Sequence, residues 1–352
     1  MKKILLILLA VPMFLACEKI NNKEEQGFPN YEKDINYKAR RKEILKMIDT
    51  RGLSSSNFPF IDCSTSTSPL RDLVMYNILD IPYEWFFNVV TGSQYHIVWN
   101  LPKGIAPGSD EHKKLSAELL ELSRSNGSHE AYVNLIDGRT DLIIDSRNIS
   151  RNELEYSNEK GVKIMTKPLA WDAMVFLVHP DNKINSLTLE QIQDIYTGNI
   201  TNWKEVGGDD LEIHPYMRDP DSGSQEKMET MVMKGKKMLV WPEMIGYNMI
   251  SPYMSIMVDE KGIGYSPYFF CESMVRDLYD VKVIAINGVK PSQKSILESV
   301  NGQSGGYPFY SQIYAAIRTD EPAKSLPHQI YDWFESESAR SIIDESGYIP
   351  LK

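Results

Sequence analysis

The sequence predicts an α/β protein with two domains. The chain has 352 residues, more than the roughly 250–300 residues that one hydrophobic core usually supports. Its hydrophobic fraction of 42% is ordinary for a packed globular protein. Short apolar segments typical of strands are followed by polar turns and then by amphipathic helical patterns. This alternation favours helices packed on sheets.

The first sixteen residues predict export from the cytoplasm. Two lysines precede an apolar run at positions 4–16, which is too short for a membrane-spanning helix of about 20 residues. The run ends in Leu15-Ala16-Cys17, which looks like a bacterial lipobox. We expect residues 1–16 to be a lipoprotein signal peptide and Cys17 to carry the lipid. The alternative is a plain secretory signal followed by an accidental cysteine.

The next segment predicts a spacer between the lipid and the folded protein. Residues 18–27 are polar and poor in large apolar side chains, and an amphipathic segment from Lys38 to Ile48 follows. Polar chains of this kind behave as tethers. We expect residues 17–57 to form a lipidated tether with an N-terminal extension, and the main fold to begin near Phe58.

A turn crowded with hydroxyl groups follows the first predicted strand. The apolar segment 58–61 leads to five consecutive Ser and Thr residues at 64–68, and Pro69 then opens a helical pattern. The free N–H groups at the start of a helix attract anions, and hydroxyl groups add further donors. Taken alone, a solvated Ser/Thr loop with one helix cap would explain this segment equally well.

Similar turns recur along the chain. One precedes the helical pattern through Leu135, one follows the apolar strand 141–144, and one follows the short strand at 214–217. Four such turns predict a site for a tetrahedral anion. The hydroxyl-bearing and charged residues of these turns, Arg147 and Arg218 among them, are the candidates for such a site.

Two of these residues supply positive charge. Arg147 and Arg218 each stand close to a serine, and the planar guanidinium group can donate two parallel hydrogen bonds to an oxyanion. For either arginine alone, a solvated or salt-bridged surface position is the alternative.

Several stretches match one protein family in order. Asp62 to Leu70 is similar to D-G-S-T-T-x-x-P-L, residues 137–147 to G-x-x-D-I-x-x-x-S-R, and Arg218 to Ser224 to R-x-x-G-S-G-T. The most specific match, at 189–208, resembles L-x-x-I-y-x-G-x-I-t-N-W-x-e-v-G-G. These motifs resemble the periplasmic phosphate-binding proteins of ABC transporters, the PstS-like branch of type II substrate-binding proteins. The resemblance extends from about Phe58 to the end of the chain.

This resemblance implies a two-lobed periplasmic-binding protein type II fold, in which each lobe is a mixed sheet flanked by helices. Lobe one would comprise residues 58–169 and 267–352, and lobe two residues 170–266, with a hinge of two crossings. The implied function is high-affinity binding of inorganic phosphate in the cleft and its delivery to an ABC importer. The ligand-binding residues that the resemblance implies are Ser64, Thr65, Ser66, Ser128, Ser146, Arg147, Arg218, Ser222, Gly223 and Ser224, with Ser125 as the alternative to Ser128. The protein would be a monomer outside the cytoplasm, without enzymatic activity, cofactor or metal.

The chain departs from the family pattern at functionally informative positions. Cys63 stands where the family usually has glycine, and Asp221 replaces the first glycine of G-S-G-T. Phosphate carries a proton at neutral pH and sulfate does not, so a buried acceptor would favour phosphate. We expect Asp221 or Asp145 to accept that proton or to orient an arginine.

Other functions remain as alternatives. A phosphate sensor or scavenger without a permease would have the same sequence features, and sulfate or molybdate would satisfy the same donors. The formal charge of −10 argues against a nucleic-acid partner. The scattered histidines and the absence of nucleophile or metal motifs argue against an enzyme. Cys63 and Cys271 could form a disulfide, although two buried free thiols are preferred.

Overall fold

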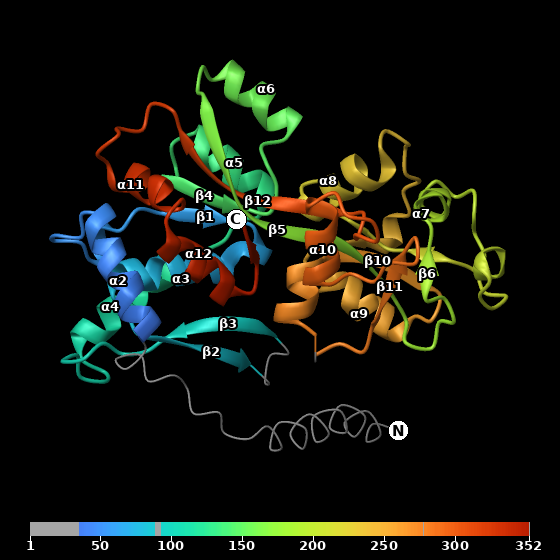
Figure 1. Ribbon diagram of the computed structural model, residues 1–352, viewed down its shortest axis with the longest axis horizontal. Coiled ribbons are helices and arrows are strands. Elements are labelled where there is room, and N and C mark those ends of the chain that lie inside the picture. Colours follow the sequence, from blue (N-terminus) through green and yellow to red (C-terminus); the bar gives the residue numbers. More distant parts are fainter. Residues whose placement is uncertain (1–34, 89–92, 277, 352) are drawn as a thin grey trace, which may run out of the picture.

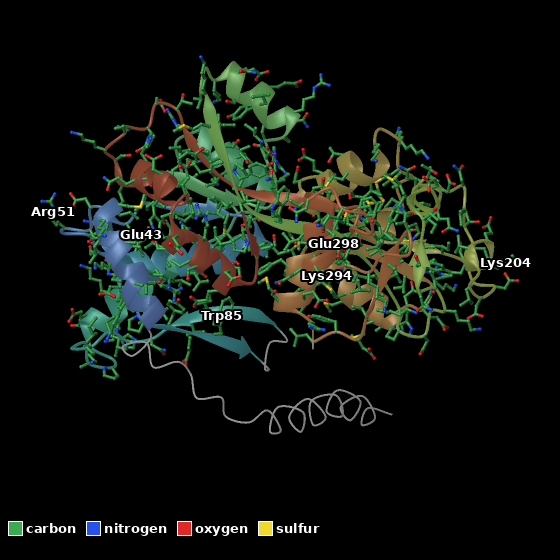
Figure 2. The ribbon with its side chains drawn as sticks, in the orientation of Figure 1. Glu43, Arg51, Trp85, Lys204, Lys294 and Glu298 are labelled. Carbon is green, nitrogen blue, oxygen red and sulfur yellow. The ribbon has the colours of Figure 1, made fainter. Side chains whose placement is uncertain are left out.

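The computed structural model describes residues 35–88, 93–276 and 278–351, so the predicted signal peptide and Cys17 lie outside the described residues. The described chain forms two lobes joined by long strands (Figure 1). Arg51 marks the outer end of lobe one and Lys204 the outer end of lobe two (Figure 2). Both lobes combine strands with helices, as the predicted fold class requires.

A nine-stranded mixed sheet runs through both lobes. Its longest member is β5 (Ile164–Val178). The first part of β5 pairs antiparallel with β12 (Tyr310–Arg318), and its last part pairs antiparallel with β10 (Gly262–Pro267) and β11 (Lys282–Ile286). The chain therefore passes from one lobe to the other inside β5, and it returns at the entrance to β12.

Lobe one contains the two ends of the described chain. Its strands are β1 (Ile61–Cys63), β2 (Tyr83–Asn88), β3 (Ser93–Trp99), β4 (Leu142–Asp145), β12 and β13 (Ile349–Pro350). Its helices are α2 (Ile35–Met47), α3 (Ser68–Leu79), α4 (Asp110–Leu122), α5 (Ser128–Ile136), α6 (Arg151–Glu159), α11 (Leu326–Trp333) and α12 (Glu337–Ser346). Short turns of helix, η1 (Ser55–Asn57) and η2 (Thr65–Thr67), precede α3.

Lobe two is formed by the middle of the chain. Its strands are β6 (Ser186–Leu187), β7 (His214–Pro215), β8 (Met217–Arg218), β9 (Ile245–Gly246), β10 and β11. Its helices are α7 (Leu189–Tyr196), α8 (Gly223–Lys227), α9 (Ser251–Val258) and α10 (Gln293–Val300), with short turns η3 (Trp203–Val206), η4 (Met228–Met233), η5 (Pro242–Met244) and η6 (Phe270–Met274).

Local sequence signals account for several helix ends. Ser150 and Glu153 form the expected capping box of α6, and Thr188 with Gln191 does the same for α7. Gly198 follows α7 with φ +77°, a conformation that glycine adopts without strain. The family-diagnostic stretch 189–208 is thus architectural, because its apolar residues pack into the core of lobe two.

The structure divides the chain differently from the expected boundary at 266. Residues 282–309 pack with lobe two, because β11 pairs with the end of β5 and with β6, and Ile296 of α10 joins the same hydrophobic core as Phe176. Lobe two therefore extends to about residue 309. The two crossings between lobes lie in β5 and before β12.

The fold also begins earlier than Phe58. Helix α2 packs against α12 and α3, and its residue Ile44 and the following Ile48 are buried in one hydrophobic cluster with Leu73 of α3 and Ile343 of α12. Arg40 forms an ion pair with Glu345 of α12. The segment expected to be an N-terminal extension is consequently, from α2 onward, part of lobe one.

Candidate functional site

A cavity of about 670 Å³ lies between the two lobes. Its wall is rich in hydroxyl groups and carries one arginine. The lining residues of lobe one are Ser64, Thr65, Ser66, Ser125, Asn126, Gly127, Ser128, His129, Glu130 and Ser146. The lining residues of lobe two are Arg218, Asp219, Asp221, Ser222, Gly223, Ser224, Tyr247, Asn248, Met249 and Ile250. Nine of the ten predicted ligand-binding residues therefore meet in one cavity.

Strand order explains how the lobe-one turns come together. Strands β1 and β4 are parallel neighbours, with Cys63 opposite Ile144. Their carboxyl ends therefore lie at the same edge of the sheet, and Ser64 and Ser146 follow them there. The Thr67 hydroxyl links the two turns, because it donates to the Ile144 carbonyl at 2.6 Å and lies 2.8 Å from the Ser64 hydroxyl.

The turn before α5 is held by a buried carboxylate. Asp62 accepts hydrogen bonds from the backbone and side-chain nitrogens of Asn126 at 3.1 and 2.7 Å. The Ser125 hydroxyl donates to the Cys63 carbonyl at 3.0 Å, whereas Ser128 begins α5. Both serines line the cavity, and the Ser125 hydroxyl is already engaged by the backbone.

The lobe-two wall is formed by β8 and the start of α8. Ser222 caps α8, and its hydroxyl accepts a hydrogen bond from the Ser224 N–H at 3.2 Å. Arg218 is only 7% exposed, and burial lowers the pKa of its guanidinium while Asp219 acts in the opposite direction. A buried guanidinium of this kind needs hydrogen-bond acceptors.

Gly223 of lobe two lies close to two serine side chains of lobe one. A Cβ added to Gly223 would lie 2.4 Å from the Ser128 hydroxyl oxygen and 3.0 Å from that of Ser146. The first contact is shorter than Cβ atoms tolerate. The missing side chain therefore allows α8 to approach the turns of lobe one, in addition to leaving its backbone accessible to a ligand.

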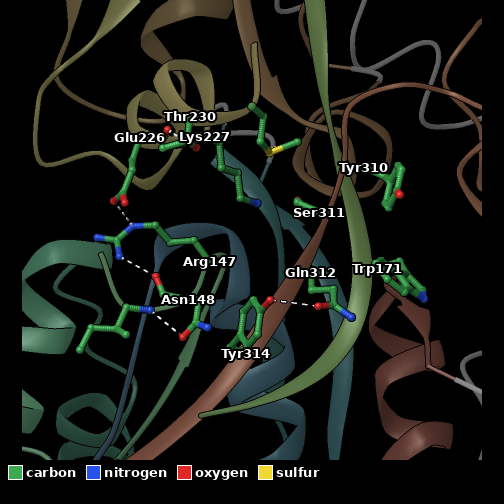
Figure 3. Close-up of a pocket in the computed structure, with 12 residues that line it drawn as sticks. Arg147, Asn148, Trp171, Glu226, Lys227, Thr230, Tyr310, Ser311, Gln312 and Tyr314 are labelled. Atoms are coloured by element: carbon green, nitrogen blue, oxygen red, sulfur yellow. Dashed lines mark hydrogen bonds and ion pairs between the residues drawn. The ribbon is translucent and has the colours of Figure 1, made fainter. Parts of the chain in front are cut away.

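The structure places Arg147 outside the cavity, contrary to the expectation from sequence. Its Nη atoms bind Glu153 at 2.6 and 2.8 Å, and its Nε forms an ion pair with Glu226 of lobe two at 2.8 Å. Figure 3 shows Arg147 beside Glu226 in a second interlobe cavity. The sequence placed Arg147 next to Ser146 correctly, but neighbouring residues at the end of a strand point in different directions.

This second cavity measures about 480 Å³ and also contains Lys227 (Figure 3). Among the described residues the Lys227 ammonium has no hydrogen-bond partner. Burial lowers its pKa, and the nearby carboxylates of Asp172 and Asp145 oppose that shift. Glu153 and Glu226 pair with Arg147 here, so its guanidinium is already engaged by two carboxylates.

The two expected proton acceptors occupy different environments. Asp221 is exposed and lines the first cavity. Asp145 is fully buried at the end of β4 and does not line that cavity. Burial raises the pKa of Asp145 to about 6, while Arg147 and a hydrogen bond with the Ser128 hydroxyl act in the opposite direction. Asp145 therefore does not line the cavity itself, although the next residue, Ser146, does.

Sequence reasoning missed the segment 247–250 of the cavity wall. From the sequence alone, Met249 in this segment is predicted to be a core residue, because no motif surrounds it and apolar side chains are usually buried. The one available signal was Asn248 three residues before Ser251-Pro252, which is typical of a helix start. That signal predicts α9 but not its position beside Arg218.

Comparison with known proteins identifies the family. A sequence model of the PBP superfamily domain matches residues 91–336. The chain belongs to the PBP superfamily. Curated relatives include the phosphate-binding protein PstS of Staphylococcus saprophyticus, 26% identical over 69% of this chain and 75% of that protein, and PstS of Bacillus subtilis, 30% identical over 51% and 55%. The resemblance to PstS-like proteins is thereby confirmed.

A solved structure supports the fold of this PBP superfamily member. The ABC-type phosphate transport receptor from Vibrio cholerae has a TM-score of 0.54 at 21% identity, covering 83% of this chain and 99% of that one. At this identity the likeness concerns the fold.

No metal site or membrane span emerges from the described ranges. They contain no group of three or more His, Cys, Asp or Glu side chains that could hold a metal ion. Nor does any helix within them have the length and hydropathy needed to cross a bilayer. Cys63 and Cys271 are both buried free thiols, as preferred from sequence, and burial raises the pKa of each to about 12.

Proposed function

We propose that this protein binds inorganic phosphate with high affinity in the cavity between its lobes and delivers it to an ABC importer. One observation carries the proposal: the buried Arg218 and hydroxyl groups from both lobes line a single cavity. The names of the PstS relatives agree with it. Binding of this kind requires no bond to be made or broken in the ligand.

The proposed ligand set comprises groups from each lobe. Lobe one contributes Ser64, Thr65, Ser66, Ser128 and Ser146, and lobe two contributes Arg218, Ser222, Gly223 and Ser224. Hydroxyl and N–H donors stabilise an anion without adding net charge. Because the donors come from two lobes, closure of the cleft completes the coordination, and a permease can then distinguish the closed protein from the open one.

The proposal includes the position of the protein in the cell. The apolar run at 4–16 and Cys17 support cleavage of a signal peptide and lipid attachment. The folded lobes would then stand outside the cytoplasm on a tether, as a monomer without enzymatic activity. Mass spectrometry of the mature protein would detect a diacylglyceryl group on Cys17, and an unmodified Cys17 would contradict this part.

Calorimetric titration with phosphate, sulfate and molybdate tests the ligand. We expect one phosphate per chain and a clear preference over the other two anions. Arg218→Ala should weaken phosphate binding by about 1.5–3 kcal/mol, the scale of a hydrogen bond to a charged group. Arg151→Ala is the matched control, because Arg151 is exposed and pairs only with Glu155 among the described residues.

The Asp221→Asn variant is titrated with the same three anions. If Asp221 accepts the proton of phosphate, the variant should lose about tenfold or more of the preference for phosphate over sulfate. An unchanged preference would leave Asp145 as the remaining candidate. Equal binding of all three anions by the wild-type protein, or full affinity in Arg218→Ala, would contradict the proposed function.

A further inference from the structure

The guanidinium of Arg218 is already engaged on three sides. Its Nε donates to the Gly246 carbonyl at 3.0 Å, and its Nη2 lies 3.5 Å from an Asp219 carboxylate oxygen. Its Nη1 donates to the thioether sulfur of Met249 at 3.0 Å. A guanidinium has five N–H groups, and these contacts use one on each nitrogen. An anion that binds the Nη1 N–H now facing Met249 would have to displace the sulfur.

The same sulfur also meets a second donor of the cavity. The Ser224 hydroxyl donates to Met249 Sδ at 3.8 Å. Met249 is 9% exposed and lines the cavity together with both donors. A single sulfur atom thus accepts from the arginine and from one of the serines that we assign to the anion.

We infer that the Met249 side chain occupies part of the anion site when no ligand is bound. By competing with the ligand for the same donors, it sets the affinity of the site. This inference rests on the proposed function and adds a residue to it. In the empty protein the thioether partly satisfies Arg218 and Ser224. When the anion binds, its oxygen takes both donors and the methionine side chain moves aside.

The chemistry of the thioether suits this role. Sulfur in methionine is a weak hydrogen-bond acceptor, so a charged oxygen displaces it at low cost. A neutral ligand gains much less from the exchange, because hydrogen bonds to charged groups are the stronger ones. Met249 therefore also disfavours the binding of neutral molecules in the cavity.

The surrounding backbone confines the movement to the Met249 side chain. Gly246 is paired with Arg218 across β8 and β9. The Asn248 side chain accepts hydrogen bonds from the N–H groups of Ile250 and Ser251 at 3.1 and 2.8 Å. With the chain fixed on both sides, the three rotatable bonds of methionine supply the adjustment.

A series of substitutions that vary acceptor strength at similar size tests the inference. Met249→Leu removes the acceptor, and Met249→Gln replaces it with a stronger one. We expect phosphate affinity, measured by calorimetry, to rise by roughly two- to tenfold in Met249→Leu and to fall by a similar factor in Met249→Gln. Met254→Leu and Met254→Gln are the controls, because Met254 is exposed on α9, and both should bind as wild type.

A spectroscopic measurement accompanies the titration. In protein labelled with ¹³C-methyl methionine, the resonance that disappears in Met249→Leu should shift on addition of phosphate, while that of Met254 should stay. Equal affinities across the Met249 series, or an unshifted Met249 resonance at saturating phosphate, would overturn the inference and leave the proposed function intact. Absence of phosphate binding in the wild type would overturn both.

Discussion

Asp145 shows how burial gives one carboxyl group a measurable effect on stability. Its side chain is fully buried, and its pKa is raised from 3.8 to about 6, chiefly by desolvation. The folded state therefore holds the proton more tightly than the unfolded state. We expect the free energy of unfolding to fall as the pH rises from about 4 to about 6, by up to ~3 kcal/mol from this group.

Asp145→Asn should remove that contribution. We expect urea denaturation between pH 4 and pH 7 to show a flatter pH profile for Asp145→Asn than for the wild type, since the amide does not titrate. Asp181→Asn serves as the control, because its carboxylate is 84% exposed. Parallel profiles for the wild type and Asp145→Asn would mean that Asp145 titrates alike in both states.

Single residues also show what the sequence could predict. Ser64 and Ser146 were predictable, because the end of a strand fixes where the following turn lies. Arg147 was not, because its direction depends on Glu153 and Glu226, which come from α6 and α8. Met249 was missed for a related reason: only the folded chain brings its sulfur to Arg218.

Helix α8 couples the two cavities at the level of an element. Its first turn carries Ser222 to Ser224 on the wall of the first cavity. Its end carries Glu226, which forms the ion pair with Arg147 of lobe one, and Lys227. This helix of lobe two thus contacts lobe one through both of its ends, and its position should report whether the cleft is closed.

Gly223→Ala should keep the lobes apart. Alanine is compatible with the helical backbone of α8, but its Cβ would lie 2.4 Å from the Ser128 hydroxyl oxygen. We expect a larger radius of gyration with phosphate present, by small-angle X-ray scattering, and about tenfold or more weaker binding. Adding Ser128→Gly to this variant should restore the compact form, and a compact single variant would contradict the close approach.

Elements of regular secondary structure were more predictable than the boundaries between lobes. The capping boxes of α6 and α7 are local signals, and both were found. The boundary at 266 was misplaced because β11 returns to β5 across about a hundred residues of chain, a pairing that no local pattern reveals.

At the scale of the whole molecule, charge and recognition act separately. The chain has a formal charge of −10, and Glu130, Asp219 and Asp221 line its first cavity together with Arg218. Long-range electrostatics therefore repel phosphate, and short-range donors must overcome that repulsion.

The association rate of phosphate, followed by stopped-flow fluorescence, should rise by roughly two- to threefold when KCl increases from low to moderate concentration, because salt screens the repulsion. A falling rate would indicate electrostatic attraction instead.

The antiparallel pairing of β5 with β12 has a mechanical consequence for the whole protein. The two strands are hydrogen-bonded to each other from 164 to 173, immediately beside the junction of the lobes. A pair of bonded strands resists shear along its length, since sliding would break the ladder, whereas twisting and bending out of its plane keep the bonds. The lobes should therefore open and close by one reproducible hinge motion. The donors on the two walls would then meet in the same register at every closure.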